Sequence, residues 1–389
     1  MKISNMAEGL VGQKMFQILA EAQQLEAQGK EILHFEIGEP DFDTPENISA
    51  AGIAAITNKK TKYVNSMGIL ELREAACEVT EKSRKFKPAV AQVLVTPGAN
   101  IQIYLAIACV ANPGDEIIIP DPGFVSYLSI IRSLGCIPIP VRLREENGFE
   151  VDPEDIRELL TDKTVMIIVN SPSNPTGSVI NETSMRQIFD IAKKRNIYLL
   201  SDEIYARMVY LETPSRPFFS PSMIDECKTT TIVVNGFSKS YSMTGWRLGV
   251  VTGPSLLISK MGLMLETILS CTPPFIQFAG LEALKGNQDK IYKMIEEYRK
   301  RRDLLVSGLN NLKGFRCKVP EGAFYVFPNI EETGLTSNQI SRLMMEKAGV
   351  VVSPGDIFGK YGEGFIRLTY ANSIDNIAKA IDKLNKIFN

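Results

Sequence analysis

The sequence predicts an α/β protein in which helices sandwich a mostly parallel central sheet, with a smaller α+β domain beside it. Between residues 93 and 253, short apolar runs alternate with segments of helical periodicity, as in parallel sheets covered on both faces. Polar and turn residues directly follow several of these runs. The chain has 389 residues, 44% of them hydrophobic and 23% charged, which suffices for one large and one smaller unit.

The N-terminal part predicts one helix and one strand. Residues 13–28 carry apolar side chains at helical spacing, and Gly29 follows as a residue that readily ends a helix. Residues 32–37 predict a short strand. Residues 38–45 contain Gly, Pro and Asp and predict a loop.

The rest of the chain predicts the sheet and a second unit. Residues 289–312 predict a long charged helix that connects the two, and residues 314–389 predict the order strand–strand–helix–strand–helix. We expect a small domain from residues 1–45 with 285–389 and a large cofactor-binding domain at residues 46–284. The apolar runs that predict strands of the central sheet are residues 93–95, 117–119, 166–169, 198–200, 232–234 and 248–251.

Composition excludes several functions. The formal net charge of −2 gives no basic excess, so no nucleic-acid partner is expected. No run of about 18 apolar residues occurs, so no membrane span is expected. Residues 1–13 lack the apolar run of a secretory signal. Six cysteines without a C-x-x-C pair fit a reducing compartment, and we expect a cytoplasmic protein.

The single histidine, His34, limits the chemistry further. An H-E-x-x-H zinc site is impossible, and a Ser-His-Asp triad would need His34 as its base. Because His34 lies in a strand-like segment, we expect a structural role for it and no metal site. Acid–base chemistry must then come from Lys, Tyr, Asp or Glu.

Residues 234–249, VNGFSKSYSMTGWRLG, leave a predicted strand through a polar, Gly-containing turn that presents Lys239. A lysine amine can form a Schiff base with an aldehyde. Arg247 follows eight residues later and offers a bidentate donor for a phosphate. Taken singly, Lys239 or Arg247 is better explained as a solvated cation on a surface loop.

Three further strand ends carry polar residues. Asp202 follows the run 198–200, where a carboxylate can pair with a protonated pyridine nitrogen, although an Asp here also suits a helix cap. Asn174 lies between two prolines that fix a sharp loop, which offers a rigidly held amide or is a plain turn. Residues 95–101 pass from strand to helix through Gly98, and free amides at a helix start suit an anion.

Their joint presence and order resemble the class I/II aminotransferases, which are pyridoxal-phosphate (PLP) enzymes of fold type I. The resemblance extends over nearly the whole chain, which implies the PLP-dependent transferase-like fold. The matching segments are Ile37–Phe42, Tyr63 with Gly68 and Leu72–Arg73, Ser173–Gly177, Asp202–Tyr205, Ser238–Lys239 with Gly245–Arg247, and Phe365–Leu368.

The resemblance implies a role for each matching position. Lys239 would hold PLP covalently and move protons, and Asp202 would pair with the pyridine nitrogen. Tyr205 and Asn174 would hold the ring oxygen, and Phe124 would stack on the ring. The phosphate would be bound by Ala99, Asn100, Ser238 and Arg247.

The remaining implied roles concern the substrates and a second subunit. Arg367 would clamp the α-carboxylate of the substrate, helped by Asn174 and the backbone of Gly38. Tyr63 would reach the phosphate of the neighbouring subunit, which implies a homodimer with shared active sites. The implied reaction is transamination between an L-amino acid and a 2-oxo acid with ping-pong kinetics.

One position departs from the family pattern. The aspartate-type subgroup often has a lysine for a second carboxylate where this chain has Asn100, so dicarboxylate specificity is in doubt unless Lys14 or Arg84 replaces it. The donor therefore stays open between aspartate, alanine, aromatic and less common amino acids. Candidates for an apolar side-chain pocket are Phe358, Tyr370 and Tyr325.

Three rival interpretations remain. A fold type I PLP lyase or decarboxylase would share the cofactor-holding residues. Residues 355–360, GDIFGK, faintly resemble the phosphate loop of nucleotide-dependent enzymes, but the motif is one residue short and no Ser or Thr follows. A protein that binds PLP only as a regulatory ligand would not need an intact set of Lys, Asp, Tyr, Asn and Arg.

Overall fold

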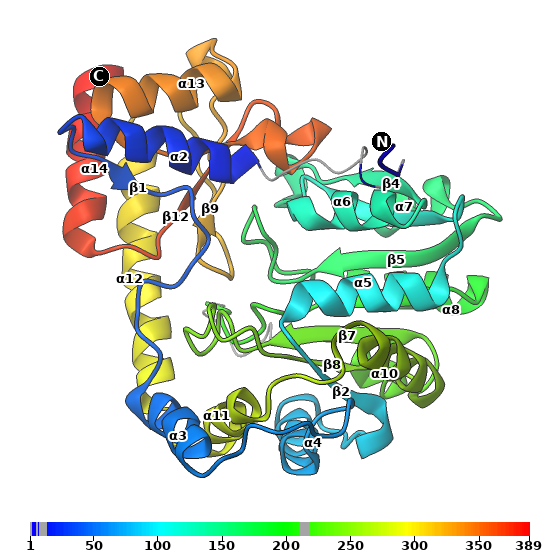
Figure 1. The fold of residues 1–389 in the computed structure, drawn as a ribbon. Coiled ribbons are helices and arrows are strands. Elements are labelled where there is room, and N and C mark those ends of the chain that lie inside the picture. The colour runs from blue at the N-terminus through cyan, green and yellow to red at the C-terminus, as the bar shows by residue number, and fades with distance from the viewer. Residues whose placement is uncertain (1, 5–6, 8–13, 211–217) are drawn as a thin grey trace.

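A computed structural model describes residues 2–4, 7, 14–210 and 218–389 (Figure 1). A seven-stranded sheet has the strand order β2-β8-β7-β6-β5-β3-β4. All neighbours are parallel except those of β8, which runs antiparallel to β7 and β2. The predicted α/β class with a mostly parallel sheet is confirmed. The strands are β2 (Val93–Thr96), β3 (Glu116–Asp121), β4 (Ile137–Arg142), β5 (Thr164–Asn170), β6 (Tyr198–Asp202), β7 (Thr231–Gly236) and β8 (Gly249–Thr252).

Strand β4 was not among the predicted runs. It alternates isoleucine with Pro138 and Pro140, and proline in a run argues against a central strand. The structure resolves the conflict by its place in the sheet, because β4 pairs only with β3 and forms the edge. An edge strand tolerates a missing N–H on its open side.

Apolar side chains point to both faces of the sheet because successive residues of a strand alternate. Ile117 and Ile119 pack toward one helical layer and Ile118 toward the other. The first layer contains α5 (Ala99–Val110), α6 (Val125–Ser133) and α10 (Ser255–Leu269). The second contains α4 (Leu70–Arg84), α7 (Pro153–Leu159), α8 (Glu182–Arg195) and the short α9 (Ser222–Asp225).

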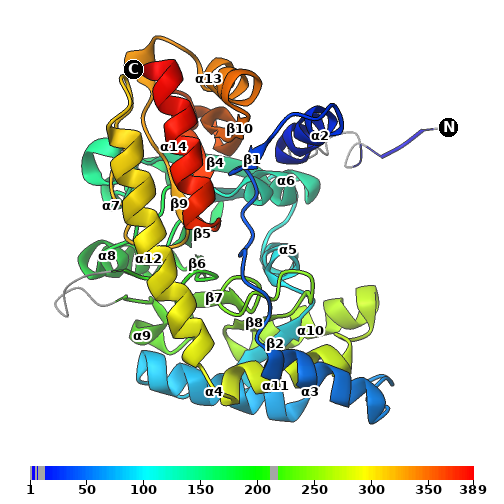
Figure 2. The ribbon, with the colours of Figure 1, turned by 90° about the vertical axis from the view of Figure 1, so that its left-hand side faces the viewer.

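The termini build a smaller unit beside the sheet (Figures 1 and 2). Strand β1 (Leu33–His34) pairs with β10 (Val350–Val351), so the two ends of the chain meet there. A second small sheet has the order β11-β12-β9. Its strands are β9 (Tyr325–Val326), β11 (Ser353–Pro354) and β12 (Ile366–Thr369), and its neighbours include α2 (Lys14–Ala27), α13 (Ser337–Leu343) and α14 (Ile374–Phe388).

Helix α12 (Asp289–Asn310) spans the molecule from the corner formed by α3 (Glu46–Thr57) and α11 (Pro274–Lys285) to the small sheets, where it packs on α14 (Figure 1). The predicted order of the tail is partly wrong. One short strand rather than two precedes α13, and three follow it, because this part pairs in stretches of two to four residues. Such short stretches carry too little periodicity to predict.

Two further properties of the described residues bear on the predictions. All six cysteines are free thiols, and four of them are buried. No helix within the described ranges is both long enough and apolar enough to cross a bilayer.

Candidate active site

A cavity of about 460 Å³ opens at the carboxyl edge of the sheet. The last residues of β5 and β6, the turn after β7 and the start of α5 form its floor, while β12 and the segment after β1 close it from the small unit. Open α/β sheets bind ligands at this edge. Its wall includes eleven of the predicted site residues, namely Gly38, Ala99, Asn100, Phe124, Asn174, Asp202, Tyr205, Ser238, Lys239, Arg247 and Arg367.

Asp202 ends β6 as a buried carboxylate. Its Oδ1 accepts from the amide of Ile204 over 3.2 Å, and its Oδ2 accepts from the hydroxyl of Tyr127 over 2.6 Å. Burial raises the pKa of Asp202 to about 6, although both hydrogen bonds oppose that rise. A buried carboxylate without a cation beside it gains most from a cationic partner, such as a protonated ring nitrogen.

Sequence reasoning missed Tyr127 and Asn170. Tyr127 lies on α6 with apolar neighbours and resembled a core residue; its only signal was its place three residues after Phe124. The side chain of Asn170, the last residue of β5, donates to the carbonyl of Asp202 over 3.0 Å and accepts from the amide of Asn174 over 2.8 Å. It therefore ties two predicted site residues together.

Lys239 extends from the turn after β7 into the cavity, where its Nζ donates to the carbonyl oxygen of Gly38 over 2.6 Å. The ammonium also lies 5.8 Å from the ring centroid of Phe324. Burial lowers the pKa of Lys239 to about 8, even though Glu39 opposes the change. The neutral, nucleophilic form of this amine is therefore far more populated near neutral pH than in an ordinary lysine.

The start of α5 forms an anion site with Arg247. Gly98 precedes the helix at φ +89°, a conformation that favours glycine, and a Cβ there would overlap the guanidinium of Arg247. Arg247 donates to the carbonyl of Thr244 over 3.0 Å and keeps other donors for a ligand. Helix amides and a guanidinium at one place suit a phosphate.

Arg367, on β12, is 1% exposed and faces the cavity. Its Nη1 donates to Oδ1 of Asn174 over 3.1 Å, and its Nη2 donates to the carbonyl of Glu36. The guanidinium lies 4.6 Å from the ring centroid of Tyr325. Its Nε has no hydrogen-bond partner among the described residues. A buried donor without an acceptor is costly, and a carboxylate would satisfy it.

Two tyrosines line the cavity beside Arg367. The hydroxyls of Tyr205 and Tyr325 lie 2.8 Å apart. A Cβ on residue 38 would overlap the Tyr325 hydroxyl, so glycine is required for the backbone to pass this close. The predicted contribution of Tyr325 to the cavity wall agrees with its position.

Several predicted residues lie elsewhere. Tyr63 is 86% exposed and does not line the cavity of this chain. Neither proposed substitute for the missing lysine reaches the cavity. Lys14 pairs with Asp356 over 3.6 Å, and Arg84 pairs with the buried Glu203 over 2.5 Å behind the sheet. Phe358 and Tyr370 are buried in apolar clusters rather than in the cavity wall.

His34 lies outside the cavity, between Glu26 and Glu36. Its Nδ1 is 2.8 Å from Glu36 and its Nε2 is 3.2 Å from Glu26. The hydrogen bond with Glu36 raises the pKa of His34 to about 9, against the effect of burial. These contacts hold α2 against the start of β1. In the part of the chain that the structure describes, no group of three or more His, Cys, Asp or Glu could hold a metal ion.

The residues present fit PLP. Among the described residues, the buried Nε of Arg367 has no acceptor and the carboxylate of Asp202 has no cationic partner. Gly98 leaves room for an anion beside Arg247. One amine, Lys239, lies between these groups and suits an aldehyde. The donor set therefore matches an anionic, aldehyde-bearing cofactor with a basic ring nitrogen.

Comparisons with known proteins agree. A family model described as aminotransferase class I and II matches residues 30–384. The chain is 41% identical to the aspartate aminotransferase of Pyrococcus horikoshii, over 92% of this chain and 90% of that one. It is 39% identical to the aromatic-amino-acid aminotransferase 2 of Thermococcus litoralis, over 93% of each.

Solved structures are similar as well. The aspartate aminotransferase of Thermus thermophilus with maleate superposes with a TM-score of 0.94, at 33% identity and over 100% of each chain. The alanine aminotransferase of Pyrococcus furiosus superposes with a TM-score of 0.94 at 30% identity, over 100% of this chain and 99% of that one. The chain thus belongs to the class I and II aminotransferase family, and it is a PLP-dependent aminotransferase.

Proposed function

We propose that the enzyme transfers the α-amino group of an L-amino acid to a 2-oxo acid in two half-reactions with ping-pong kinetics. The observation that carries this proposal is the convergence of Lys239, Asp202 and Arg367 on one cavity. An amine, a buried anion and a buried cation are the three groups that such a transfer needs from the protein.

PLP, when bound, supplies an aldehyde that bonds to amino groups and a ring that accepts electrons from the substrate α-carbon. Lys239 would hold the cofactor and, once released from it, would move the proton to and from the substrate α-carbon. Its pKa near 8 suits both directions of that proton transfer. The carboxylate of Asp202 keeps the ring nitrogen protonated, and Tyr127 keeps this carboxylate in place.

Arg367 binds the substrate carboxylate, and Asn174 orients the guanidinium through its Oδ1. The hydroxyl of Tyr205, which lies 2.8 Å from that of Tyr325, would donate to the ring oxygen together with the side-chain amide of Asn174. Phe124 would cover one face of the ring, and Ser238 and Arg247 would hold the phosphate together with the amides at the start of α5.

The active enzyme, in this proposal, is a homodimer with shared sites. Tyr63 is 86% exposed, an unusual state for an aromatic side chain in one subunit. Exposed apolar residues accompany it on neighbouring segments of the large domain, and a second subunit would cover them. These residues are Ile53, Ile56, Leu70, Leu263, Ile268 and Leu269.

Subunit mixing tests the shared sites. Neither Tyr63→Ala nor Lys239→Ala homodimers should transaminate well. A hybrid of the two carries one doubly altered site and one intact site, so mixing should restore activity toward half that of the wild type per hybrid. Recovery only to the average of the two parents would mean that Tyr63 serves its own subunit or none.

We further propose a small domain of residues 1–45 and 285–389, a large domain of residues 46–284 and a cytoplasmic location, which the free cysteines support. The preferred amino donor, in this proposal, carries an uncharged side chain. Asn100 is neutral, and the three cations that line the cavity bind the cofactor or the α-carboxylate, so none is left for a second carboxylate. These cations are Lys239, Arg247 and Arg367.

The test is a screen of single amino acids against the PLP form, followed by its absorbance. The expected result is conversion to the aminated cofactor and release of the 2-oxo acid, faster with aromatic or aliphatic donors than with aspartate. Release of ammonia or carbon dioxide instead would identify the rival lyase or decarboxylase. Faster conversion with aspartate would contradict the proposed donor class.

A further inference from the structure

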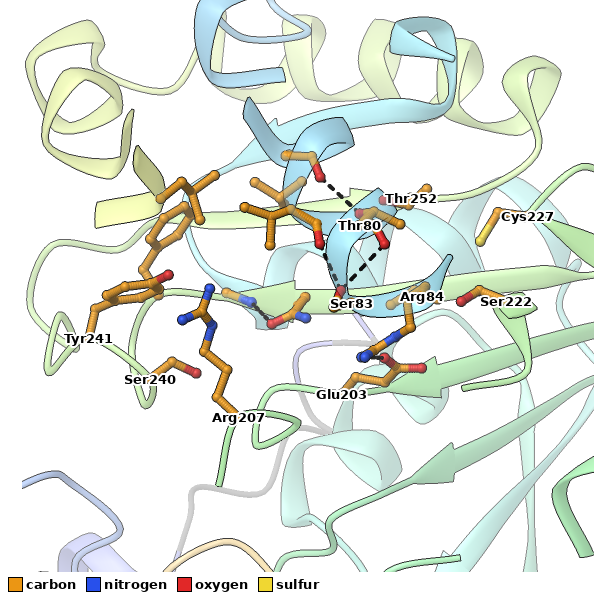
Figure 3. A pocket seen from close by; sticks show the side chains of 18 of the residues that line it. Thr80, Ser83, Arg84, Glu203, Arg207, Ser222, Cys227, Ser240, Tyr241 and Thr252 are labelled. Carbon is orange, nitrogen blue, oxygen red and sulfur yellow. Dashed lines mark hydrogen bonds and ion pairs between the residues drawn. The ribbon is translucent and has the colours of Figure 1, made fainter. Parts of the chain in front are cut away.

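A second cavity lies behind the catalytic turn (Figure 3). It has a volume of about 110 Å³ and lies between α4 and the face of β7 and β8 opposite to α5. It shares no lining residue with the catalytic cavity. Residues that are neighbours in the sequence nevertheless line different cavities. Asp202 and Lys239 line the catalytic cavity, and the residues that follow them, Glu203 and Ser240, line the second one.

One end of this cavity holds the buried ion pair of Arg84 and Glu203 (Figure 3). Glu203 is 0% exposed and also accepts from the hydroxyls of Ser201 and Ser220. Its charge is therefore fully satisfied by protein groups, and this end of the cavity offers little to a ligand.

At the other end, one buried hydroxyl finds no acceptor among the residues that the structure describes. Tyr241 is 2% exposed, and its hydroxyl has no hydrogen-bond partner among the described residues. Arg207 lies with its guanidinium 4.9 Å from the ring centroid of Tyr241. Its Nη1 donates to the neutral Oε1 of Gln288 over 3.0 Å, and no carboxylate of residues 14–210 or 218–389 forms an ion pair with it. A phenol and a guanidinium on one wall call for an anionic acceptor.

The remaining wall is small and mixes apolar side chains with hydroxyl groups such as those of Thr80 and Ser83, which already donate to carbonyls of α4. Val79, Phe86, Val250 and Leu284 contribute side chains from three elements and the loop after α4. The volume is below the about 150 Å³ of a cavity that accommodates benzene, so only a short aliphatic body fits. Burying that body against these side chains would add a favourable apolar contribution.

We propose that this cavity is a binding site for a short-chain aliphatic carboxylate, with its carboxylate on Arg207 and Tyr241 and its alkyl chain against α4. A ligand here touches Phe237, Ser240 and Tyr241, and so supports the turn that carries Lys239 from behind. Short-chain fatty acids and short-chain 2-oxo acids both combine a carboxylate with a short alkyl chain, so either could occupy the cavity.

The test measures binding of butyrate to the holoenzyme by saturation-transfer NMR. Because Arg367 also binds carboxylates, the experiment crosses two variants. Binding at the new site should persist in Arg367→Gln. It should weaken about 10- to 100-fold in Arg207→Gln/Arg367→Gln, the range expected for a hydrogen bond to a charged group. Every further variant therefore also carries Arg367→Gln. Butyramide, which has the same shape without the charge, should bind much more weakly than butyrate.

Two matched variants separate binding in this cavity from an effect of surface charge. Lys82→Gln removes one exposed charge from α4 and should leave binding unchanged, while Val79→Phe fills the cavity, keeps Arg207 and should abolish binding. Bound PLP and an unchanged Tm show that each variant is folded. Replacing butyrate with 2-oxobutyrate in Arg367→Gln distinguishes the two sources. The proposal is overturned if butyrate binding is lost in Arg367→Gln, survives unweakened in Arg207→Gln/Arg367→Gln, or equals that of butyramide. These readouts do not require transamination, so they remain decisive even if the proposed donor class is wrong.

Discussion

The hydroxyl of Tyr127 donates to Oδ2 of Asp202 over 2.6 Å, at the bottom of the cavity, where no cation of the described residues pairs with the carboxylate. This bond lowers the pKa of Asp202, whereas burial raises it. Tyr127, together with the amide of Ile204, thus favours the ionised form of a carboxylate whose ionisation burial disfavours.

Replacing the tyrosine should weaken cofactor binding. In Tyr127→Phe the pKa of Asp202 should rise further above about 6, so the neutral acid persists to higher pH and pairs less well with a ring cation. Losing a hydrogen bond to a charged group predicts about 10-fold weaker PLP binding or more. The measurement is the PLP dissociation constant against pH, with Tyr198→Phe as control. If the PLP dissociation constant changes with pH on the acid side in the same way in Tyr127→Phe and the wild type, the role of Tyr127 is refuted.

Reconstitution of the apoprotein should follow the protonation of Lys239. Its pKa is lowered to about 8, so the neutral amine, which attacks the aldehyde, predominates above that pH and is lost as pH falls through it. The rate of PLP incorporation, followed by absorbance, should rise with pH and level off above about 8. A rate that keeps rising toward about 10.4, the pKa of an ordinary lysine, would contradict this environment.

Arg367→Lys should separate substrate binding from cofactor binding. A lysine keeps the charge but loses the bidentate geometry and the contact with Asn174. We expect kcat/KM for amino acids and 2-oxo acids to fall by roughly 100-fold, in line with the loss of one charge-assisted pair. The absorption spectrum of bound PLP should not change. Altered PLP affinity with an unchanged KM would exclude the carboxylate clamp.

The pair of Arg84 and Glu203 should act on stability. Glu203 is fully buried, so Arg84→Met leaves an unpaired charge and should cost about 3–5 kcal/mol of unfolding free energy. The double variant Arg84→Met/Glu203→Gln removes both charges and should recover part of that loss. Denaturant unfolding of the three proteins measures both effects. A double variant less stable than the single one would show that the carboxylate is stabilised without its arginine.

Much of the site was predictable because its polar residues directly follow apolar strands. Lys239, Asp202 and Asn174 each come after such a run, and the carboxyl ends of parallel strands meet at one edge. The strand pattern by itself does not tell that Asp202 faces the cofactor cavity while Glu203 faces α4, and the choice of Asp202 comes from the family resemblance. Which way each carboxylate faces depends on the path of the turn after β6, where Glu203 donates its amide to Val234.

Other features depend on contacts far apart in the chain. Tyr127 serves Asp202 across 75 positions, and its helical setting resembles that of any core aromatic residue. Strand β4 escaped prediction because its prolines suit only a sheet edge, and which strand forms the edge is a property of the whole sheet. The exclusion of Arg84 from the substrate site likewise required the position of Glu203.

The most direct test of the account is chemical capture of the cofactor. Borohydride reduction of the yellow holoenzyme, followed by peptide mass mapping, should locate PLP on Lys239. Label and transamination should both be absent from Lys239→Ala and intact in Lys193→Ala, an exposed control. Turnover of Lys239→Ala near the wild-type rate, or label on another lysine, would contradict the assignment.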